Sequence, residues 1–221
     1  MSRFRNRTEA GQALAAELAR RGYADPVILA LPRGGVPVAI EAVRTLKAPM
    51  DLVMVRKIGA PGQPELAVAA VVNGDDPQLA VNASVARHAG LSMQDIERMA
   101  EAQLAEIRRR RALYLKGRAQ VPVEGRTAIV VDDGIATGAT MRASLKAVRQ
   151  RHPAKLVLAV PVAAPDTLED LSAEVDDIVC LFRPLMLGAV GAHYADFGQT
   201  PDEDVIRLMD EADRLQARPA S

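Results

Sequence analysis

The stretch that most constrains this chain covers residues 127–141, Thr-Ala-Ile-Val-Val-Asp-Asp-Gly-Ile-Ala-Thr-Gly-Ala-Thr-Met. Residues 128–131 are apolar and rich in β-branched side chains, which is typical of a buried strand in a parallel sheet. Asp132 and Asp133 follow, where that strand should end. From about residue 139, apolar side chains recur at helical spacing. The pattern therefore predicts a strand, a short turn and a helix.

The turn between that strand and that helix predicts an anion site. Gly134 and Gly138 allow a tight bend, and Thr137 and Thr140 add hydroxyl groups. Backbone N–H groups and the positive end of the helix dipole meet at the start of a helix, and small side chains let a phosphate approach. The two acids would repel a phosphate but suit hydroxyl groups or bound magnesium. We therefore expect a sugar phosphate, with its hydroxyls at the acids and its phosphate in the turn.

Two other phosphate motifs do not fit this stretch. A P-loop requires a lysine directly after its second glycine, and no lysine follows Gly138. The dinucleotide fingerprint Gly-x-Gly-x-x-Gly is also absent from the turn. The stretch instead resembles the phosphoribosyl-pyrophosphate signature of the type I phosphoribosyltransferases, a hydrophobic strand and two acids followed by Thr-Gly-x-Thr. The alternative is an ordinary strand, turn and helix with acids at the tip.

Strands alternate with helices along the rest of the chain, which predicts an α/β fold with a mainly parallel twisted sheet and flanking helices. We expect one domain over residues 1–221, with ligands bound at the carboxyl edge of the sheet. Thr8 is predicted to cap the first helix, and Pro161 to end a strand. The predicted strands are residues 26–31, 51–55, 65–72, 128–131, 155–160 and 177–182, and the predicted helices are residues 8–21, 37–46, 91–116, 165–171 and 201–215.

A second turn, Pro32-Arg33-Gly34-Gly35, follows the first predicted strand. Arg33 supplies positive charge and the glycine N–H groups allow close approach, so this turn can hold a second anion. In the resembled family the corresponding turn binds pyrophosphate and often contains a cis peptide bond just before the glycines. The resemblance therefore implies a pyrophosphate site at Arg33, Gly34 and Gly35 and a cis bond between Pro32 and Arg33. A plain tight turn is the alternative.

Arg56 and Lys57 come at the end of the predicted strand 51–55, before an expected irregular loop over residues 58–64. In type I enzymes a mobile loop near this place closes over the reacting centre, so the resemblance favours Lys57 as a pyrophosphate ligand. The alternative is that both cations are solvated at a strand edge. Glu65 is a weaker candidate, as the proton acceptor for the incoming nucleophile.

Two further segments stand out from the core pattern. Residues 83–118 are predicted to form a helical insertion that covers the cleft or makes a dimer contact, and its basic run 108–111 reads as a solvated face paired with glutamates. Residues 183–200 are rich in glycine and aromatic side chains, and by resemblance they form a base-recognition hood. His193 is a candidate general base there, although a histidine beside a tyrosine is more often packed or hydrogen-bonded.

Composition excludes several function classes. The 28 basic and 28 acidic residues cancel, and only 3% of residues are aromatic, so neither a global field nor base-stacking platforms recruit nucleic acid. The single cysteine, Cys180, excludes an internal disulfide and a cysteine-rich metal site. No stretch reaches the length of a membrane span and the polar N-terminus is no secretory signal, so we expect a cytoplasmic protein.

The resemblance implies a reaction: displacement at C1 of phosphoribosyl pyrophosphate by a nitrogen nucleophile, with pyrophosphate leaving and Mg²⁺ bridging. Asp132 and Asp133 would hold the ribose hydroxyls, directly or through magnesium-bound water. Arg33 and Lys57 would take the pyrophosphate, and catalysis would come from positioning and electrostatics. The 5′-phosphate would lie on Ala136, Thr137, Gly138, Ala139 and Thr140.

The acceptor is narrowed by one departure from the family pattern. Members that act on 6-oxopurines place a third acid where this chain has Ala136, so hypoxanthine and guanine are disfavoured. The whole-chain pattern looks like a subfamily of predicted phosphoribosyltransferases with an unassigned acceptor, and nucleotide salvage and a homodimer are expectations from the family. Two other classes remain open: a non-catalytic sensor of phosphoribosyl pyrophosphate or a nucleotide, and a hydrolase of a phosphorylated nucleoside.

Overall fold

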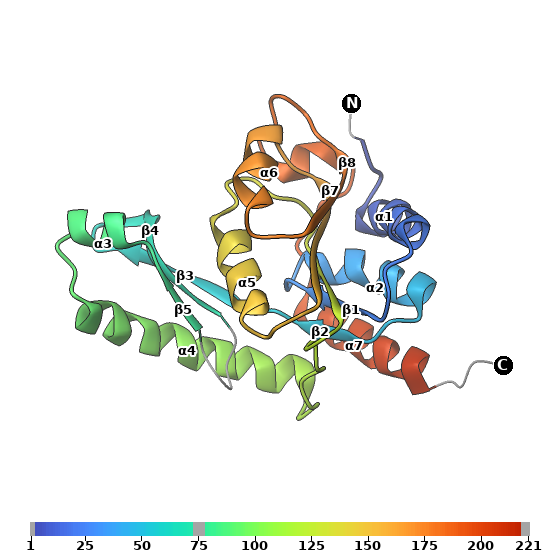
Figure 1. Cartoon of the computed structure of the whole chain (residues 1–221), viewed down its shortest axis with the longest axis horizontal. Helices are drawn as coiled ribbons and strands as arrows, with labels where there is room; N and C mark the ends of the chain where they lie inside the picture. Colours follow the sequence, from blue (N-terminus) through green and yellow to red (C-terminus); the bar gives the residue numbers. More distant parts are fainter. Residues whose placement is uncertain (1–2, 73–77, 218–221) are drawn as a thin grey trace.

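The computed structural model describes residues 3–72 and 78–217, without the side chains of residues 64, 65 and 78. Over these residues the strands form two separate sheets, one of five strands and one of three. The larger sheet carries helices on both of its faces, while the smaller one extends to one side of it (Figure 1). Among the described helices, none combines the length and the apolar character needed to cross a membrane.

The five-stranded sheet has the order β2-β1-β6-β7-β8, and all of its neighbouring strands are parallel. Its central strand, β6, is buried along its whole length because helices cover both faces. The α/β prediction with a mainly parallel sheet is therefore confirmed. The strands are β1 (Pro26–Ala30), β2 (Met50–Leu52), β6 (Thr127–Val131), β7 (Lys155–Val162) and β8 (Asp177–Phe182).

Successive residues of a strand point to opposite faces, which divides the interior into two cores. In β1, Ile28 packs in the core beneath α1, α2 and α7, whereas Leu29 packs in the core beneath α5 and α6. The helices lie on these two faces in Figure 1. Their bounds are α1 (Arg7–Arg21), α2 (Gly35–Leu46), α5 (Ala139–Arg149), α6 (Pro165–Ser172) and α7 (Asp202–Ala217).

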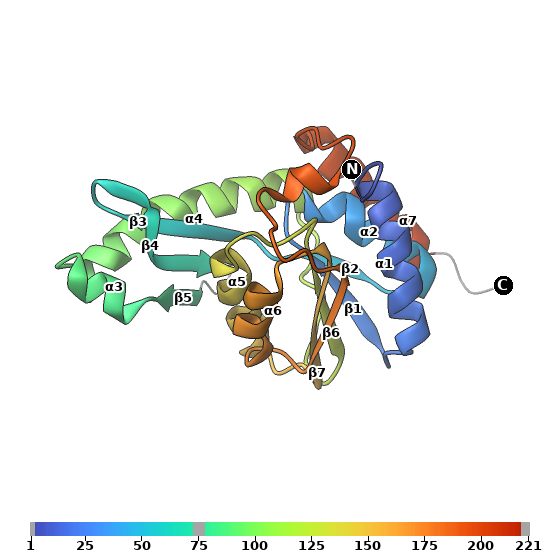
Figure 2. The same cartoon turned by 90° about the horizontal axis from the view of Figure 1, so that it is seen from above.

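The smaller sheet is antiparallel, with the order β3-β4-β5, and it corrects two predictions. The expected irregular loop at 58–64 is a hairpin, because β3 runs to residue 60 and β4 begins at residue 63. The insertion also contains these strands as well as helices, so it begins well before residue 83 (Figure 2). Its elements are β3 (Val55–Ala60), β4 (Gln63–Val72), β5 (Gln78–Val81), α3 (Ala83–His88) and α4 (Met93–Leu115).

Two boundary predictions are wrong for local reasons. The side chain of Asn6, rather than Thr8, caps α1, since Asn6 Oδ1 accepts a hydrogen bond of 3.0 Å from the Glu9 N–H. Strand β7 continues through Pro161, because its pairing with β6 ends at Ala159 and the missing N–H leaves no gap in that ladder.

The long helix α4 begins at residue 93, two residues after its predicted start, and Ser92 caps it. Ser92 Oγ accepts a hydrogen bond from the Asp95 N–H, and the Asp95 side chain accepts one from the Ser92 N–H. In its basic run, Arg109 and Arg110 pair with Glu106, which agrees with a solvated face for these two cations. Arg111 differs, because it is buried.

Candidate functional site

Asp132 and Asp133, the acid pair, stand directly after the last residue of β6, at the carboxyl edge of the large sheet. The Asp133 N–H donates a hydrogen bond of 2.8 Å to Asp132 Oδ1. Burial is the main cause that raises the pKa of both carboxyls, and the neighbouring charge of Asp133 raises that of Asp132 further. The acid pair is therefore an environment that favours a positive charge or a hydrogen-bond donor placed against it.

The glycine turn, residues 32–35, packs directly against the acid pair. The Pro32–Arg33 peptide bond is cis, as the family resemblance predicted. A Cβ atom at Gly34 would lie 2.1 Å from Asp133 Oδ2, and one at Gly35 would lie 2.7 Å from the Val131 carbonyl oxygen. Only residues without a side chain allow this approach, so the structure brings the glycine turn into contact with the acid pair.

The phosphate turn, residues 136–140, is open to solvent. Ala136, Thr137, Ala139 and Thr140 are all exposed. Gly138 precedes α5 with a φ of 75°, and it makes no side-chain cap on the helix. The backbone N–H groups at the start of α5 thus lie at an exposed turn, and the binding of an anion there stays a prediction.

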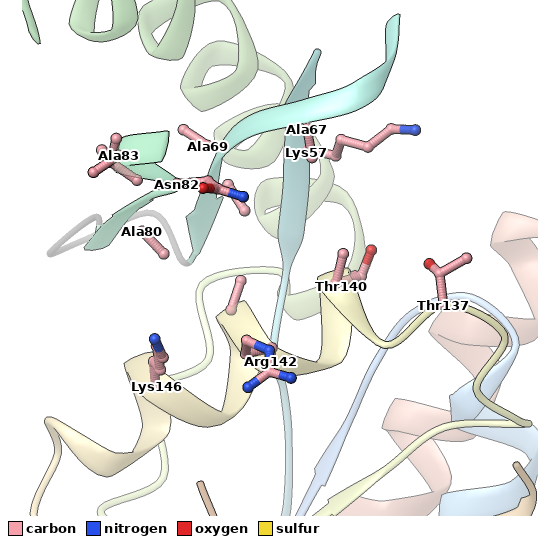
Figure 3. A pocket seen from close by; sticks show the side chains of 14 residues that line it. Lys57, Ala67, Ala69, Ala80, Asn82, Ala83, Thr137, Thr140, Arg142 and Lys146 are labelled. Carbon is pink, nitrogen blue, oxygen red and sulfur yellow. The ribbon is translucent and has the colours of Figure 1, made fainter. Parts of the chain in front are cut away.

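Lys57 faces the phosphate turn across a cavity of about 400 Å³. The cavity lies between the three-stranded sheet and α5, and both Thr137 and Thr140 line it. Figure 3 shows the Lys57 side chain extending over the start of α5, on the same side as the two threonine hydroxyls. Lys57 and the phosphate turn can therefore contact one anion from two sides.

Arg33 is held at the other side of the site by α7 and α4. Its Nη1 atom lies 3.3 Å from Asp202 Oδ1, and the Tyr114 hydroxyl donates a hydrogen bond of 2.6 Å to the same oxygen. Burial together with this hydrogen bond raises the pKa of Tyr114 to about 12. Arg33 thus already has an anionic partner, and its contact with pyrophosphate remains a prediction.

A cation that the sequence analysis missed reaches the acid pair. Arg7, the first residue of α1, donates from Nε to Asp133 Oδ2 at 2.8 Å and from Nη1 to the Gly198 carbonyl at 2.7 Å. Its guanidinium lies 3.9 Å from the centre of the Phe197 ring. No spacing in the sequence indicates this contact, because Arg7 and Asp133 are 126 positions apart.

The hood, residues 183–200, packs on the N-terminal segment and on the acid pair. The Tyr194 hydroxyl donates a hydrogen bond of 2.6 Å to the Asp133 carbonyl oxygen. His193 Nε2 lies 2.9 Å from the Leu187 carbonyl oxygen, and its ring meets Phe182 edge-on at 5.5 Å. This supports the packed alternative for His193 over a general base. The side chain of Glu65, the other candidate base, lies outside what the structure describes. Residues 73–77, whose sequence Asn-Gly-Asp-Asp-Pro predicts a turn, also lie outside the described residues.

The described part of the chain holds no group of three or more His, Cys, Asp or Glu side chains arranged to bind a metal ion. The two carboxylates of the acid pair have the oxygen chemistry that Mg²⁺ prefers, but they supply too few ligands alone. The residues therefore fit a magnesium ion whose other ligands are water and substrate oxygens.

Comparison with known proteins agrees with this geometry. Residues 4–183 match the model of the phosphoribosyl transferase domain family. Two Mycobacterium tuberculosis proteins, provisionally named phosphoribosyl transferases, are 42% identical over 214 residues; the match covers 97% of this chain but only 48% of each relative. The crystal structure of TT1426 from Thermus thermophilus has a TM-score of 0.83 at 44% identity, over 95% of this chain and 98% of that one. The chain belongs to the phosphoribosyl transferase domain family.

Proposed function

We propose that the chain transfers a 5-phosphoribosyl group from phosphoribosyl pyrophosphate to a nitrogen nucleophile and releases pyrophosphate. One observation carries the proposal: the open phosphate turn, the acid pair and the glycine turn adjoin one another at one edge of the sheet. A sugar that bears a phosphate at one end and a pyrophosphate at the other requires two anion sites on either side of a polar centre. The contact of the glycine turn with the acid pair, and the position of the phosphate turn directly after that pair, support this assignment.

The acid pair is assigned to the ribose. Asp132 and Asp133 accept hydrogen bonds from the ribose hydroxyls and stabilise the positive charge that develops on the ring as the bond to pyrophosphate breaks. Because burial raises the pKa of both carboxyls, their environment is poorly solvated and their attraction for that charge is weakly screened. The ion pair with Arg7 holds the carboxylate of Asp133 in place.

The phosphate groups are assigned to the two turns and to Lys57. Residues 136–140 bind the 5′-phosphate through the start of α5, and Gly34 and Gly35 present backbone N–H groups to the pyrophosphate. Lys57 and Arg33 supply positive charge to the leaving group, Arg33 after exchanging Asp202 for the substrate. Magnesium, when bound with the substrate, neutralises further charge on the phosphates.

The acceptor is a base-like nitrogen compound other than a 6-oxopurine. Position 136 is an exposed alanine, so the phosphate turn offers no third carboxylate for the purine proton. The hood lies over the acid pair through Tyr194 and is the segment that we assign to acceptor recognition. A role in salvage of such bases and assembly as a homodimer belong to the same proposal.

A second candidate is a non-catalytic sensor of phosphoribosyl pyrophosphate. Two of the groups assigned to the site are already ion-paired within the chain, Asp133 with Arg7 and Arg33 with Asp202. A regulator would use the exchange of these pairs for substrate to change its shape. A nucleotide hydrolase is less well supported, because hydrolysis of a monophosphate requires no second anion turn.

Pyrophosphate release separates these functions. The assay uses phosphoribosyl pyrophosphate with a panel of nucleobases and related nitrogen heterocycles, with and without Mg²⁺. Transfer predicts release that depends on one acceptor and on Mg²⁺. Lys57→Met should slow this release, whereas Lys47→Met should not, because Lys47 is exposed at the end of α2 that lies away from the glycine turn. Release without any acceptor would indicate hydrolysis, and silence across the panel with retained binding would indicate the sensor.

A further inference from the structure

The cavity beside the phosphate turn continues along α5, where its lining runs from Ala139 to Lys146. One wall comes from the small sheet, with Ala69 on β4 and Ala80 on β5, and the other from α5, with Ala139 and Ala143. Figure 3 shows Ala69 and Ala80 above the helix. Because alanine reaches only one carbon beyond the backbone, two such walls leave a flat, apolar gap between them. We call the space between these four residues the alanine slot.

The rim of the alanine slot is positively charged. Lys57, Arg142 and Lys146 line the same cavity, and none of its described lining residues is acidic. Arg142 Nη1 and Lys146 Nζ lie 3.2 Å and 3.6 Å from the same oxygen, Glu174 Oε1, so two cations share one carboxylate. An excess of positive charge at the mouth of an apolar gap favours a ligand that is both aromatic and anionic.

One neutral polar group also reaches the slot. Asn82 lines the cavity, and its Oδ1 accepts a hydrogen bond of 3.3 Å from the Val85 N–H as the cap of α3. The amide nitrogen of Asn82 thereby remains as a donor on the cavity side (Figure 3). A donor of this kind can select a ring that carries an acceptor atom.

The proposed reaction uses only one end of this cavity. Lys57, Thr137, Ala139 and Thr140 line that end, whereas the acid pair does not line the cavity. The part between Ala69, Ala80 and Ala143 has no role in the proposed reaction. We infer that the slot is a second ligand site. Its ligand is a flat aromatic ring with an anionic substituent, and it is a different compound from both substrates of the proposed reaction. Thr137, Thr140 and Lys57, which we assign to the phosphates of the substrate, line the same cavity as the slot. A ligand bound in the slot therefore regulates the neighbouring site. Only this regulatory coupling rests on the proposed function.

Two naphthalene probes test the slot on the whole chain by fluorescence titration. One is 8-anilinonaphthalene-1-sulfonate, and the other is N-phenyl-1-naphthylamine, which has the same rings without the charge. We expect saturable binding of the sulfonate, with weaker binding of the neutral probe. Replacing both Arg142 and Lys146 by glutamine should weaken the sulfonate about fivefold, as expected for two partly exposed charge contacts, and should leave the neutral probe unchanged.

Filling the slot tests the location. Ala80→Phe places a ring in the gap from the sheet side, and it should abolish binding of both probes while thermal unfolding shows that the fold is retained. Met186→Ser is the matched control, because Met186 is an apolar side chain that does not line the cavity and is 91% exposed. Unchanged sulfonate binding in folded Ala80→Phe, loss of binding in Met186→Ser, or equal affinity for the two probes would overturn the inference.

Calorimetry with phosphoribosyl pyrophosphate separates this inference from the proposed function. If the sulfonate binds in the slot and phosphoribosyl pyrophosphate does not bind at all, the slot is supported and the proposed function fails. If phosphoribosyl pyrophosphate binds and the sulfonate does not, the slot is refuted and the proposed function is untouched.

Discussion

Replacing Arg7 by methionine tests whether the acid pair is held from the N-terminal helix. The side chains of Arg7 and Asp133 are only 13% and 14% exposed, and their contact is 2.8 Å long. Methionine keeps most of the length of arginine but removes the charge and both hydrogen bonds. The substitution therefore isolates the electrostatic contacts from the packing against Phe197.

The expected loss follows from those contacts. A hydrogen bond to a charged group contributes about 1.5–3 kcal/mol, and a partly desolvated cation–π contact adds about 1 kcal/mol. Asp133 can take up a proton once Arg7 is gone, because burial raises its pKa, and this limits the penalty. We expect the free energy of unfolding to fall by about 3 kcal/mol, or roughly 6–12 °C in Tm for a chain of this size.

Urea unfolding of a double-mutant cycle measures this loss. Arg7→Met should destabilise the Asp133→Asn background by about 2 kcal/mol less than the wild type, because the charge pair is already absent there. The loss should also be smaller at pH 4 than at pH 8, because Arg7 lowers the pKa of Asp133 and removing it raises that pKa. The stabilisation by Arg7 therefore grows as the pH rises through these pKa values and is complete where the carboxyl is ionised in both proteins. Arg5→Met is the matched control, and little change is expected because the Arg5 side chain is 82% exposed. A loss below about 1 kcal/mol for Arg7→Met, or an additive cycle, would refute the reasoning.

Three further predictions concern the packing of the site. Asp132→Asn should gain stability relative to the wild type as the pH rises above 3.8, the ordinary pKa of this carboxyl. Burial raises the pKa of Asp132 in the folded protein, so the unfolded chain loses its proton first and the wild type is destabilised. Urea unfolding midpoints measured across this pH range test the prediction. Gly35→Ala should destabilise the fold by about 2 kcal/mol, because the new Cβ would lie 2.7 Å from the Val131 carbonyl oxygen. Gly198→Ala is the control, since the nearest atom there is 3.8 Å away and the Tm measured by thermal unfolding should not change. Burial raises the pKa of all three tyrosines, that of Tyr114 to about 12, so absorbance at 295 nm should stay flat through pH 10; a tyrosine that titrates there would contradict the packing.

The parts of the site that the sequence predicted are those built from consecutive residues. The apolar run of β6, the acid pair and the phosphate turn each follow from local composition, and the structure has α5 beginning at residue 139 as expected. The glycine turn was predicted in the same way, and its cis bond came from the family resemblance alone. Local signals suffice here because each feature depends on one strand end or one helix start.

The parts that the sequence did not predict depend on contacts between distant segments. The hairpin of β3 and β4 contains Gly59 and Gly62 and many alanines, residues with low strand propensity, so the pairing of the two strands decides the structure. Arg7 lies in a helix whose own sequence gives no sign of the acid pair. The alanine slot likewise exists only because the small sheet packs near α5.

Calorimetric titration with phosphoribosyl pyrophosphate and Mg²⁺ tests the central claim most directly, that residues 132–140 bind a phosphorylated pentose. We predict one binding site per chain in the wild type and a loss of affinity of at least about tenfold when Asp132 and Asp133 are both replaced by asparagine, a change that preserves the shape of the site. Wild-type affinity in that double variant, or no binding by the wild-type protein, would contradict the account.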